Sequence, residues 1–174
     1  MSDYTVDRVV ILSDMHVPYE DKFAQALVLR FIQEFKPHKL IINGDLLDAY
    51  QLSPFDREPA RRMTFAKDVL AAKDYLAQLV SVTPATTEKV FLGGNHCDRI
   101  RRYLWRNAPE VSEVIGSDIP ELLGLQDWRY IPFYNPISVT GNVPGYNLDN
   151  VLLITHGICI RKWSGATARA HFAR

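Results

Sequence analysis

The fold is decided by one stretch of the sequence, Ile41-Ile42-Asn43-Gly44-Asp45-Leu46-Leu47-Asp48. Residues 39–42 are mostly aliphatic, are too short for a helix and lead into a glycine, which indicates a short buried strand. A buried strand that opens into Gly-Asp delivers a carboxylate to the carboxyl edge of its sheet, where open α/β sheets bind their ligands. Asp45 is therefore the first candidate for a functional residue.

The composition is that of one ordinary globular domain. The 174 residues are 47% hydrophobic and 23% charged. Lysine plus arginine and aspartate plus glutamate both count 20, so the net charge predicts no polyanionic partner, although local patches could bind one. Neither Cys97 nor Cys159 belongs to a CxxC pair, which argues against a thiolate zinc site. The sequence shows no secretory segment and no long apolar span, so we expect a cytoplasmic protein without a membrane partner.

Further apolar runs predict buried strands at residues 9–12, 89–92 and 151–154. Each ends, like the strand at 39–42, in polar residues. The endings are Asp14-Met15-His16, Gly44-Asp45 with Asp48, Gly94-Asn95-His96 and Thr155-His156-Gly157. The first two strands flank a predicted helix and form a βαβ unit, so they should be parallel, with both ends at one edge of the sheet.

Helical patterns fill the segments between these strands. Asp21 is the expected N-cap of the first helix and Pro37 ends it. The inward stripe of this helix is expected to consist of Phe23, Leu27, Phe31 and Phe35, flanked by Ala24, Val28 and Ile32. A second helix is expected over residues 60–80, and Asp98 is the expected cap of a third helix that ends at Asn107. The inward face of the second helix is expected to carry Met63, Ala66, Leu70, Ala77 and Val80.

The last third of the chain carries weaker signals. Short helical pieces are expected up to Leu125. Strands at residues 128–133 and 137–140 are expected to begin a second sheet, and Ser164 is the expected cap of a final helix.

Each polar strand ending is a weak signal alone, and their co-occurrence after buried strands is a strong one. Carboxylate, imidazole and amide oxygen ligands suit hard or borderline cations such as Mn, Fe or Zn. Two such ions roughly 3.5–4 Å apart can clamp a phosphoryl group and supply a hydroxide. A pair of cations needs a shared central carboxylate, which Asp45 is placed to provide.

The motif order Asp14-x-His16, Gly44-Asp45-x-x-Asp48, Gly94-Asn95-His96 and His156-Gly157 is similar to that of the calcineurin-like metallophosphoesterases, over essentially the whole chain. Asp14-Met15-His16-Val17-Pro18 and Arg161-Lys162-Trp163-Ser164-Gly165 resemble the small bacterial and bacteriophage branch. The resemblance implies an α/β sandwich of two mixed sheets flanked by helices, formed by residues 1–174 as a single domain.

The resemblance also implies a role for each motif residue. It assigns Asp14 and His16 to a first ion, Asp45 to a bridge, and Asn95 and His156 to a second ion. His96 would protonate the leaving oxygen and Asp48 would orient His96. A carboxylate on one imidazole nitrogen does fix the tautomer and stabilise the protonated form. The implied cofactors are two divalent ions, Mn, Fe or Zn, of which Mn is favoured.

Two features depart from the family pattern. Cys97 stands where the family usually has an acidic residue, and we interpret it as a small packed side chain. The family's closing Gly-His-x-His is absent, and His171 is the only histidine in that region. We therefore expect a C-terminally truncated domain that lacks the last strands of its second sheet and has little activity as it stands. A natural variant with an incomplete site is the alternative.

The sequence thus supports two functions. The first is a dinuclear metal hydrolase of phosphomonoesters or phosphodiesters that attacks with a metal-bound hydroxide; the second is a non-catalytic binding or scaffold protein with the same fold. Arg99, Arg102 and Arg106 share a face of the helix that begins at the metal loop, and they are candidates to bind substrate phosphate, Arg99 and Arg102 first. The alternative is a solvated face paired with Glu110 or Glu113. The expected partner is a phosphoester, with nucleotides and nucleic acids among the candidates, and the oligomeric state is left open.

Overall fold

The computed structural model describes residues 7–115, 118–133, 145–149 and 151–157. The strand predicted at 137–140 and the helix predicted after Ser164 lie outside these ranges. The elements in chain order are β1 (Val9–Leu12), α1 (Lys22–Phe35), β2 (Lys39–Asn43), the 3-10 helix η1 (Tyr50–Leu52), α2 (Phe65–Val82), β3 (Glu88–Leu92), α3 (Asn95–Asn107), α4 (Pro109–Ile115), α5 (Ile119–Leu123), β4 (Arg129–Ile131), β5 (Tyr146–Leu148) and β6 (Leu152–Ile154).

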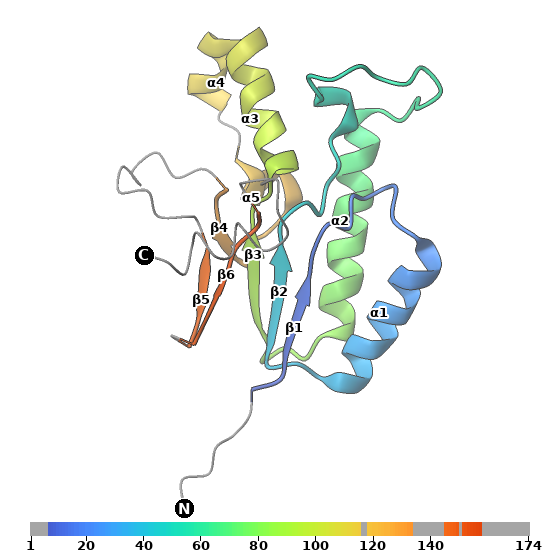
Figure 1. The fold of residues 1–174 in the computed structure, drawn as a ribbon, viewed down its shortest axis with the longest axis vertical. Coiled ribbons are helices and arrows are strands. Elements are labelled where there is room, and N and C mark those ends of the chain that lie inside the picture. The colour runs from blue at the N-terminus through green and yellow to red at the C-terminus, as the bar shows by residue number, and fades with distance from the viewer. Residues whose placement is uncertain (1–6, 116–117, 134–144, 150, 158–174) are drawn as a thin grey trace, which may run out of the picture.

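A parallel sheet in the order β1-β2-β3-β4 forms the centre of the fold, with α1 and α2 on one face and the antiparallel pair β5-β6 on the other (Figure 1). The parallel pairing of β1 with β2, in which Ile11 lies opposite Ile41, confirms the predicted βαβ unit. The predicted α/β architecture of two sheets flanked by helices is also confirmed. Within the described residues, one sheet is wholly parallel and the other antiparallel.

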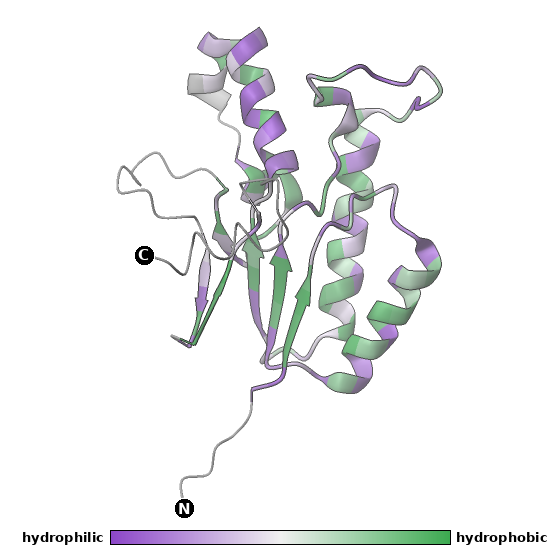
Figure 2. Cartoon of the chain, viewed as in Figure 1, coloured by the Kyte–Doolittle hydropathy of each residue, from purple (hydrophilic) through white to green (hydrophobic). Residues whose placement is uncertain are grey.

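The strands of the central sheet supply two cores because successive side chains point to opposite faces. Leu40 and Ile42 of β2 pack toward the helices, whereas Ile41 packs with Tyr146 and Ile154 of the smaller sheet. Figure 2 shows the central strands as largely hydrophobic and α3 as largely hydrophilic. Within the described ranges, no helix has the length and apolar character of a membrane span.

The strand expected to begin a second sheet at residues 128–133 belongs instead to the first sheet. β4 pairs in parallel with β3, with Ile131 opposite Leu92. The smaller sheet consists of β6, where a strand was predicted, and β5, where none was. The partner of β4 is set by the path of the chain through α3, α4 and α5, which a local pattern does not encode.

The cap of α1 was predicted correctly, and its buried face was predicted in part. The Asp21 carboxylate accepts hydrogen bonds from the backbone N–H groups of Phe23 and Ala24. Phe23, Leu27 and Phe31 of the expected stripe are exposed by 74%, 51% and 52%, whereas the flanking Ile32 is buried and Val28 packs against the core. Residues spaced four apart drift by about 40° per step around a helix, so of the four residues at that spacing only Phe35 reaches the core side, where it is partly buried.

The start and the buried face of α2 also differ from the prediction. The helix begins at Phe65 with Thr64 as its N-cap, because the segment before it is an irregular loop. The residues buried on α2 are Asp68, Val69, Ala72, Tyr75, Leu76 and Leu79, whereas the expected Ala66, Leu70, Ala77 and Val80 are exposed and Met63 precedes the helix, partly buried. Both sets have helical spacing, so the choice between them is made by the tertiary packing.

Candidate metal centre

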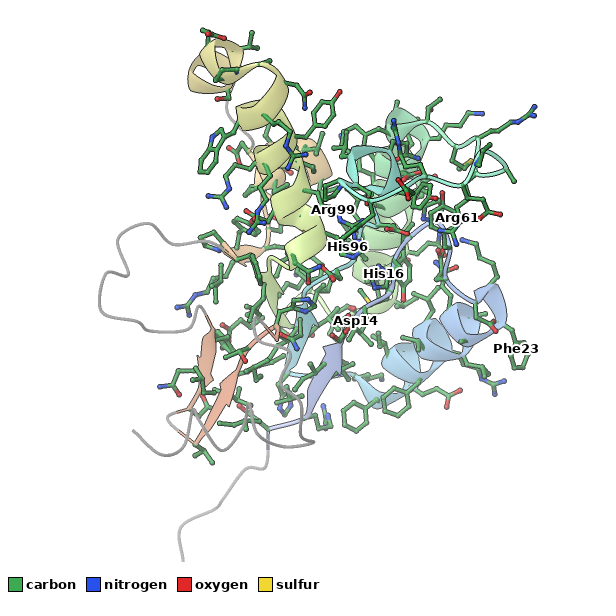
Figure 3. All side chains as sticks on the ribbon, turned by 45° about the horizontal axis from the view of Figure 1, so that its top comes forward. Asp14, His16, Phe23, Arg61, His96 and Arg99 are labelled. Carbon is green, nitrogen blue, oxygen red and sulfur yellow. The ribbon has the colours of Figure 1, made fainter. Side chains whose placement is uncertain are left out.

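The polar strand endings meet at the carboxyl edge of the central sheet. The backbone N–H of His16 donates to the carbonyl of Asp45 at 3.0 Å, so the loops after β1 and β2 are joined directly. Figure 3 shows Asp14, His16 and His96 following one another from the end of β1 to the start of α3. His156 follows β6 and is hydrogen-bonded to Asn95, at the start of α3. The parallel direction of β1, β2 and β3 thus brings three of the motifs to one edge, and β6 of the smaller sheet adds the fourth.

Asp45 lies at the centre of this cluster and is almost fully buried, at 2% exposure. Its Oδ1 accepts a hydrogen bond from the backbone N–H of His96 at 2.9 Å, and its Oδ2 lies 3.2 Å from Nε2 of His156. Burial by itself would raise the pKa of Asp45, but the hydrogen bonds from His156 and His96 outweigh it and hold the pKa below its ordinary value. The central carboxylate is therefore ionised and engaged on both of its oxygens.

His156 provides the clearest indication that the cluster fits a cation. Its Nδ1 lies 2.9 Å from the carbonyl oxygen of Asn43, and its Nε2 lies 3.0 Å from Oδ1 of Asn95. With Asp45 also at Nε2, hydrogen-bond acceptors face both ring nitrogens, which favours either a doubly protonated ring or a cation in place of one proton. Accordingly, the hydrogen bond with Asp45 raises the pKa of His156 against the effect of burial. Convergent oxygens and an imidazole nitrogen are the donor set expected for a hard or borderline divalent ion.

A second group of donors adjoins the first and shares Asp45. One ligand atom from each of Asp14, His16 and Asp45 lies within 4.8 Å of the others. Asp45, Asn95 and His156 form the other group through the contacts given above. The structure therefore brings together all the residues for which metal binding was predicted. It also brings His16, Asp48 and His96 within the same 4.8 Å range, a grouping that the sequence did not suggest.

The backbone at these positions is strained in a way typical of functional sites. Asp14, His16 and Asp45 have φ values of 54°, 48° and 46°, and such a left-handed conformation costs a non-glycine residue about 1–3 kcal/mol. Two glycines make room for the cluster: a Cβ on Gly44 would overlap the His156 ring, and one on Gly94 would overlap the Asp45 carboxylate. The local backbone is thus shaped around the side chains that carry the chemistry.

Asp48, His96 and Arg99 form a linked group beside the metal-ligand cluster. Nδ1 of His96 lies 3.0 Å from Oδ1 of Asp48 and 2.7 Å from its carbonyl oxygen. Burial alone would raise the pKa of Asp48, but the hydrogen bond with His96 dominates and lowers it. Arg99 donates from Nη1 to the Asp48 carbonyl at 3.1 Å, and its Nη2 lies 2.9 Å from Nε2 of His96. The sequence did not indicate this role of Arg99; its position three residues after His96 on one helix was the available signal.

The start of α3 differs from the prediction. The helix begins at Asn95 with Gly94 at the N-cap, so Asp98 is not a cap. Instead, Asp98 lies buried in the first turn and forms ion pairs with Arg101 and Arg102. Cys97 is buried, which raises the pKa of its thiol to about 12. A protonated thiol in the core agrees with its interpretation as a packed side chain.

The fold and the site together define an α/β protein with a carboxylate–imidazole cluster suited to divalent cations. The family profile of the calcineurin-like phosphoesterases matches residues 7–165. The chain belongs to this family, which confirms the resemblance seen in the sequence. No curated protein matches the chain. Family membership indicates metal-dependent hydrolysis of phosphoesters, and the described residues contain groups able to hold the metal. His171 and residues 161–165 lie outside the described ranges.

Proposed function

We propose that the chain is a dinuclear hydrolase of phosphomonoesters or phosphodiesters, with Mn as the favoured metal. The observation that carries this proposal is the position of Asp45 between two groups of donors, Asp14 with His16 and Asn95 with His156. Bound between these groups, two divalent ions would neutralise phosphoryl oxygens and supply hydroxide from water. A buried carboxylate shared by both groups is what a pair of neighbouring cations requires to offset their repulsion.

His96 is assigned to protonation of the leaving oxygen and Asp48 to the orientation of His96. The contact of Nδ1 with Asp48 leaves Nε2 as the atom that can face a substrate. In this structure Arg99 donates to Nε2. An arriving phosphate competes for the same guanidinium, because Arg–phosphate pairs are strong and charge-assisted. Binding of substrate phosphate by Arg99 would therefore release Nε2 of His96 for proton transfer.

The test is hydrolysis of p-nitrophenyl phosphate and bis(p-nitrophenyl) phosphate by the 174-residue chain, with Mn, Fe, Zn or Mg added to chelator-treated protein. Because this chain is expected to have little activity, even slow metal-dependent turnover of either ester supports the proposal if it is lost in the Asp45→Asn variant. Metal binding without turnover of any ester would favour the binding or scaffold function instead. A comparison of the monoester and the diester rates distinguishes a phosphomonoesterase from a phosphodiesterase.

A further inference from the structure

One face of α3 leads away from the candidate metal centre and carries cations and an aromatic ring. At about 100° per residue, residues 99, 102, 103 and 106 share an arc of roughly 120° with residue 96. We call Arg99, Arg102, Tyr103 and Arg106 the α3 strip. Cys97 and Ile100, on another side of the helix, are buried in the core. Because α3 extends beyond the sheet edge (Figure 1), the α3 strip continues the site outward.

The α3 strip is both basic and accessible. The helix contains four arginines and one acidic residue, whereas the whole chain has equal numbers of basic and acidic residues, 20 of each. Asp98 holds Nε of Arg102 at 2.5 Å, yet the Arg102 side chain is 66% exposed. Arg106 is exposed and forms no ion pair within the part of the chain that the structure describes. Tyr103 is 41% exposed.

The spacing along the α3 strip suits a chain of phosphates better than a single one. From residue 99 to residue 106 the helix rises about 10 Å, which is longer than one phosphate group, so the three guanidinium groups are spread over more than one phosphate of an extended strand. Guanidinium groups bind phosphate through paired N–H donors. An exposed tyrosine among them can stack on a base. In a duplex the face of each base is covered by its neighbouring base pairs, so this contact requires a single strand.

We infer that the substrate is a single-stranded nucleic acid whose phosphates follow the α3 strip and one of whose bases stacks on Tyr103. The inference rests on the proposed function, since it names the polymer whose phosphodiester the metal centre would cut. A mononucleotide would engage Arg99 and leave Arg102 and Arg106 unused. A phosphopeptide offers one phosphate and would likewise leave the outer part of the α3 strip without a ligand.

The test measures binding separately from hydrolysis. Fluorescein-labelled dT2, dT12 and rU12 are titrated with the full chain in EDTA, and anisotropy is followed at several salt concentrations. We expect dT12 or rU12 to bind more tightly than dT2. With about three phosphate contacts, the logarithm of the binding constant should fall with the logarithm of salt concentration with a slope of about −2. A labelled phosphoserine peptide is the competing ligand.

Variants assign the binding to the α3 strip. Arg102→Gln with Arg106→Gln should weaken dT12 binding about tenfold at 0.15 M salt and reduce the slope to about −0.7. Arg106→Gln alone should weaken it about fourfold. Tyr103→Ala should lose about fivefold or more, and Tyr103→Phe should retain wild-type affinity because it keeps the ring. The matched control is Arg30→Gln with Lys73→Gln, which removes the same charge from exposed positions on α1 and α2 and should change affinity less than twofold.

The outcomes separate this inference from the proposed function. Equal losses in the α3 variants and the control, equal binding of dT2 and dT12, or tighter binding of the phosphopeptide would each overturn the nucleic-acid assignment. The hydrolase would then still stand if Asp45→Asn abolished metal-dependent turnover of bis(p-nitrophenyl) phosphate. If no ester is hydrolysed but the length and variant effects appear, the proposed hydrolysis is wrong and the strip is a nucleic-acid-binding surface.

Discussion

Replacement of Asp45 by asparagine should disrupt both metal positions at once. The residue is 2% exposed, so solvent screens little of the attraction between its carboxylate and a bound ion. For a divalent ion about 4 Å from the carboxylate at an effective dielectric constant of about 20, the gross attraction is on the order of 8 kcal/mol. Desolvation of the ion cancels most of this energy. Loss of a group that merely supports a ligand reduces affinity about 10- to 100-fold, so we expect Asp45→Asn to lose at least about 100-fold for both ions.

The assay is metal content by mass spectrometry together with calorimetric titration of Mn into chelator-treated protein. Asn95→Ala should weaken mainly one of the two binding steps, because Asn95 contacts only the His156 side of the cluster. Asp98→Asn is the matched control: it removes a buried carboxylate from the first turn of α3, one that binds Arg101 and Arg102 instead of the cluster. Unchanged metal stoichiometry and affinity in Asp45→Asn would refute the assignment of Asp45 as the shared ligand.

Three further predictions concern the catalytic pair, the pH dependence of stability and the packing of α1. In turnover assays, His96→Ala should slow the hydrolysis of esters with poor leaving groups more than that of nitrophenyl esters. Asp48→Asn should show a milder form of this pattern. An equal loss of rate for all leaving groups would exclude His96 as the general acid. The pKa of His156 is raised in the folded state, so its contribution to the metal-free protein is complete below the ordinary pKa of about 6.5 and is lost as pH rises through the folded-state pKa. Denaturant unfolding in EDTA should therefore show stability falling over that range, and His156→Gln should remove this component. Ile32→Ala should lower the free energy of unfolding by about 2–4 kcal/mol, whereas Phe23→Ser, at a 74% exposed position, should change it by less than about 0.5 kcal/mol; similar losses in urea unfolding would contradict the observed face of α1.

Much of the candidate site could be predicted because its signals are local. A short apolar run followed by Gly-Asp or Gly-Asn-His marks a buried strand and its polar end, and a helix between two strands makes them parallel. The ends of β1, β2 and β3 were thereby expected at one edge, as observed. The contacts that complete the site are not local. The carbonyl of Asn43 at His156 and the guanidinium of Arg99 at His96 join groups whose relative positions depend on the folded backbone.

The sequence by itself determined the family, the polar strand endings and the residues available for metal binding, because these depend on residue type and on order along the chain. Only the tertiary structure decided which faces of α1 and α2 are buried, that β4 joins the central sheet, and that Asp98 pairs with arginines instead of capping a helix. In α2, two sets of side chains have equally good helical spacing. The buried set is the one that packs against other elements of the fold, because the helical spacing alone does not determine which side of a helix meets its neighbours.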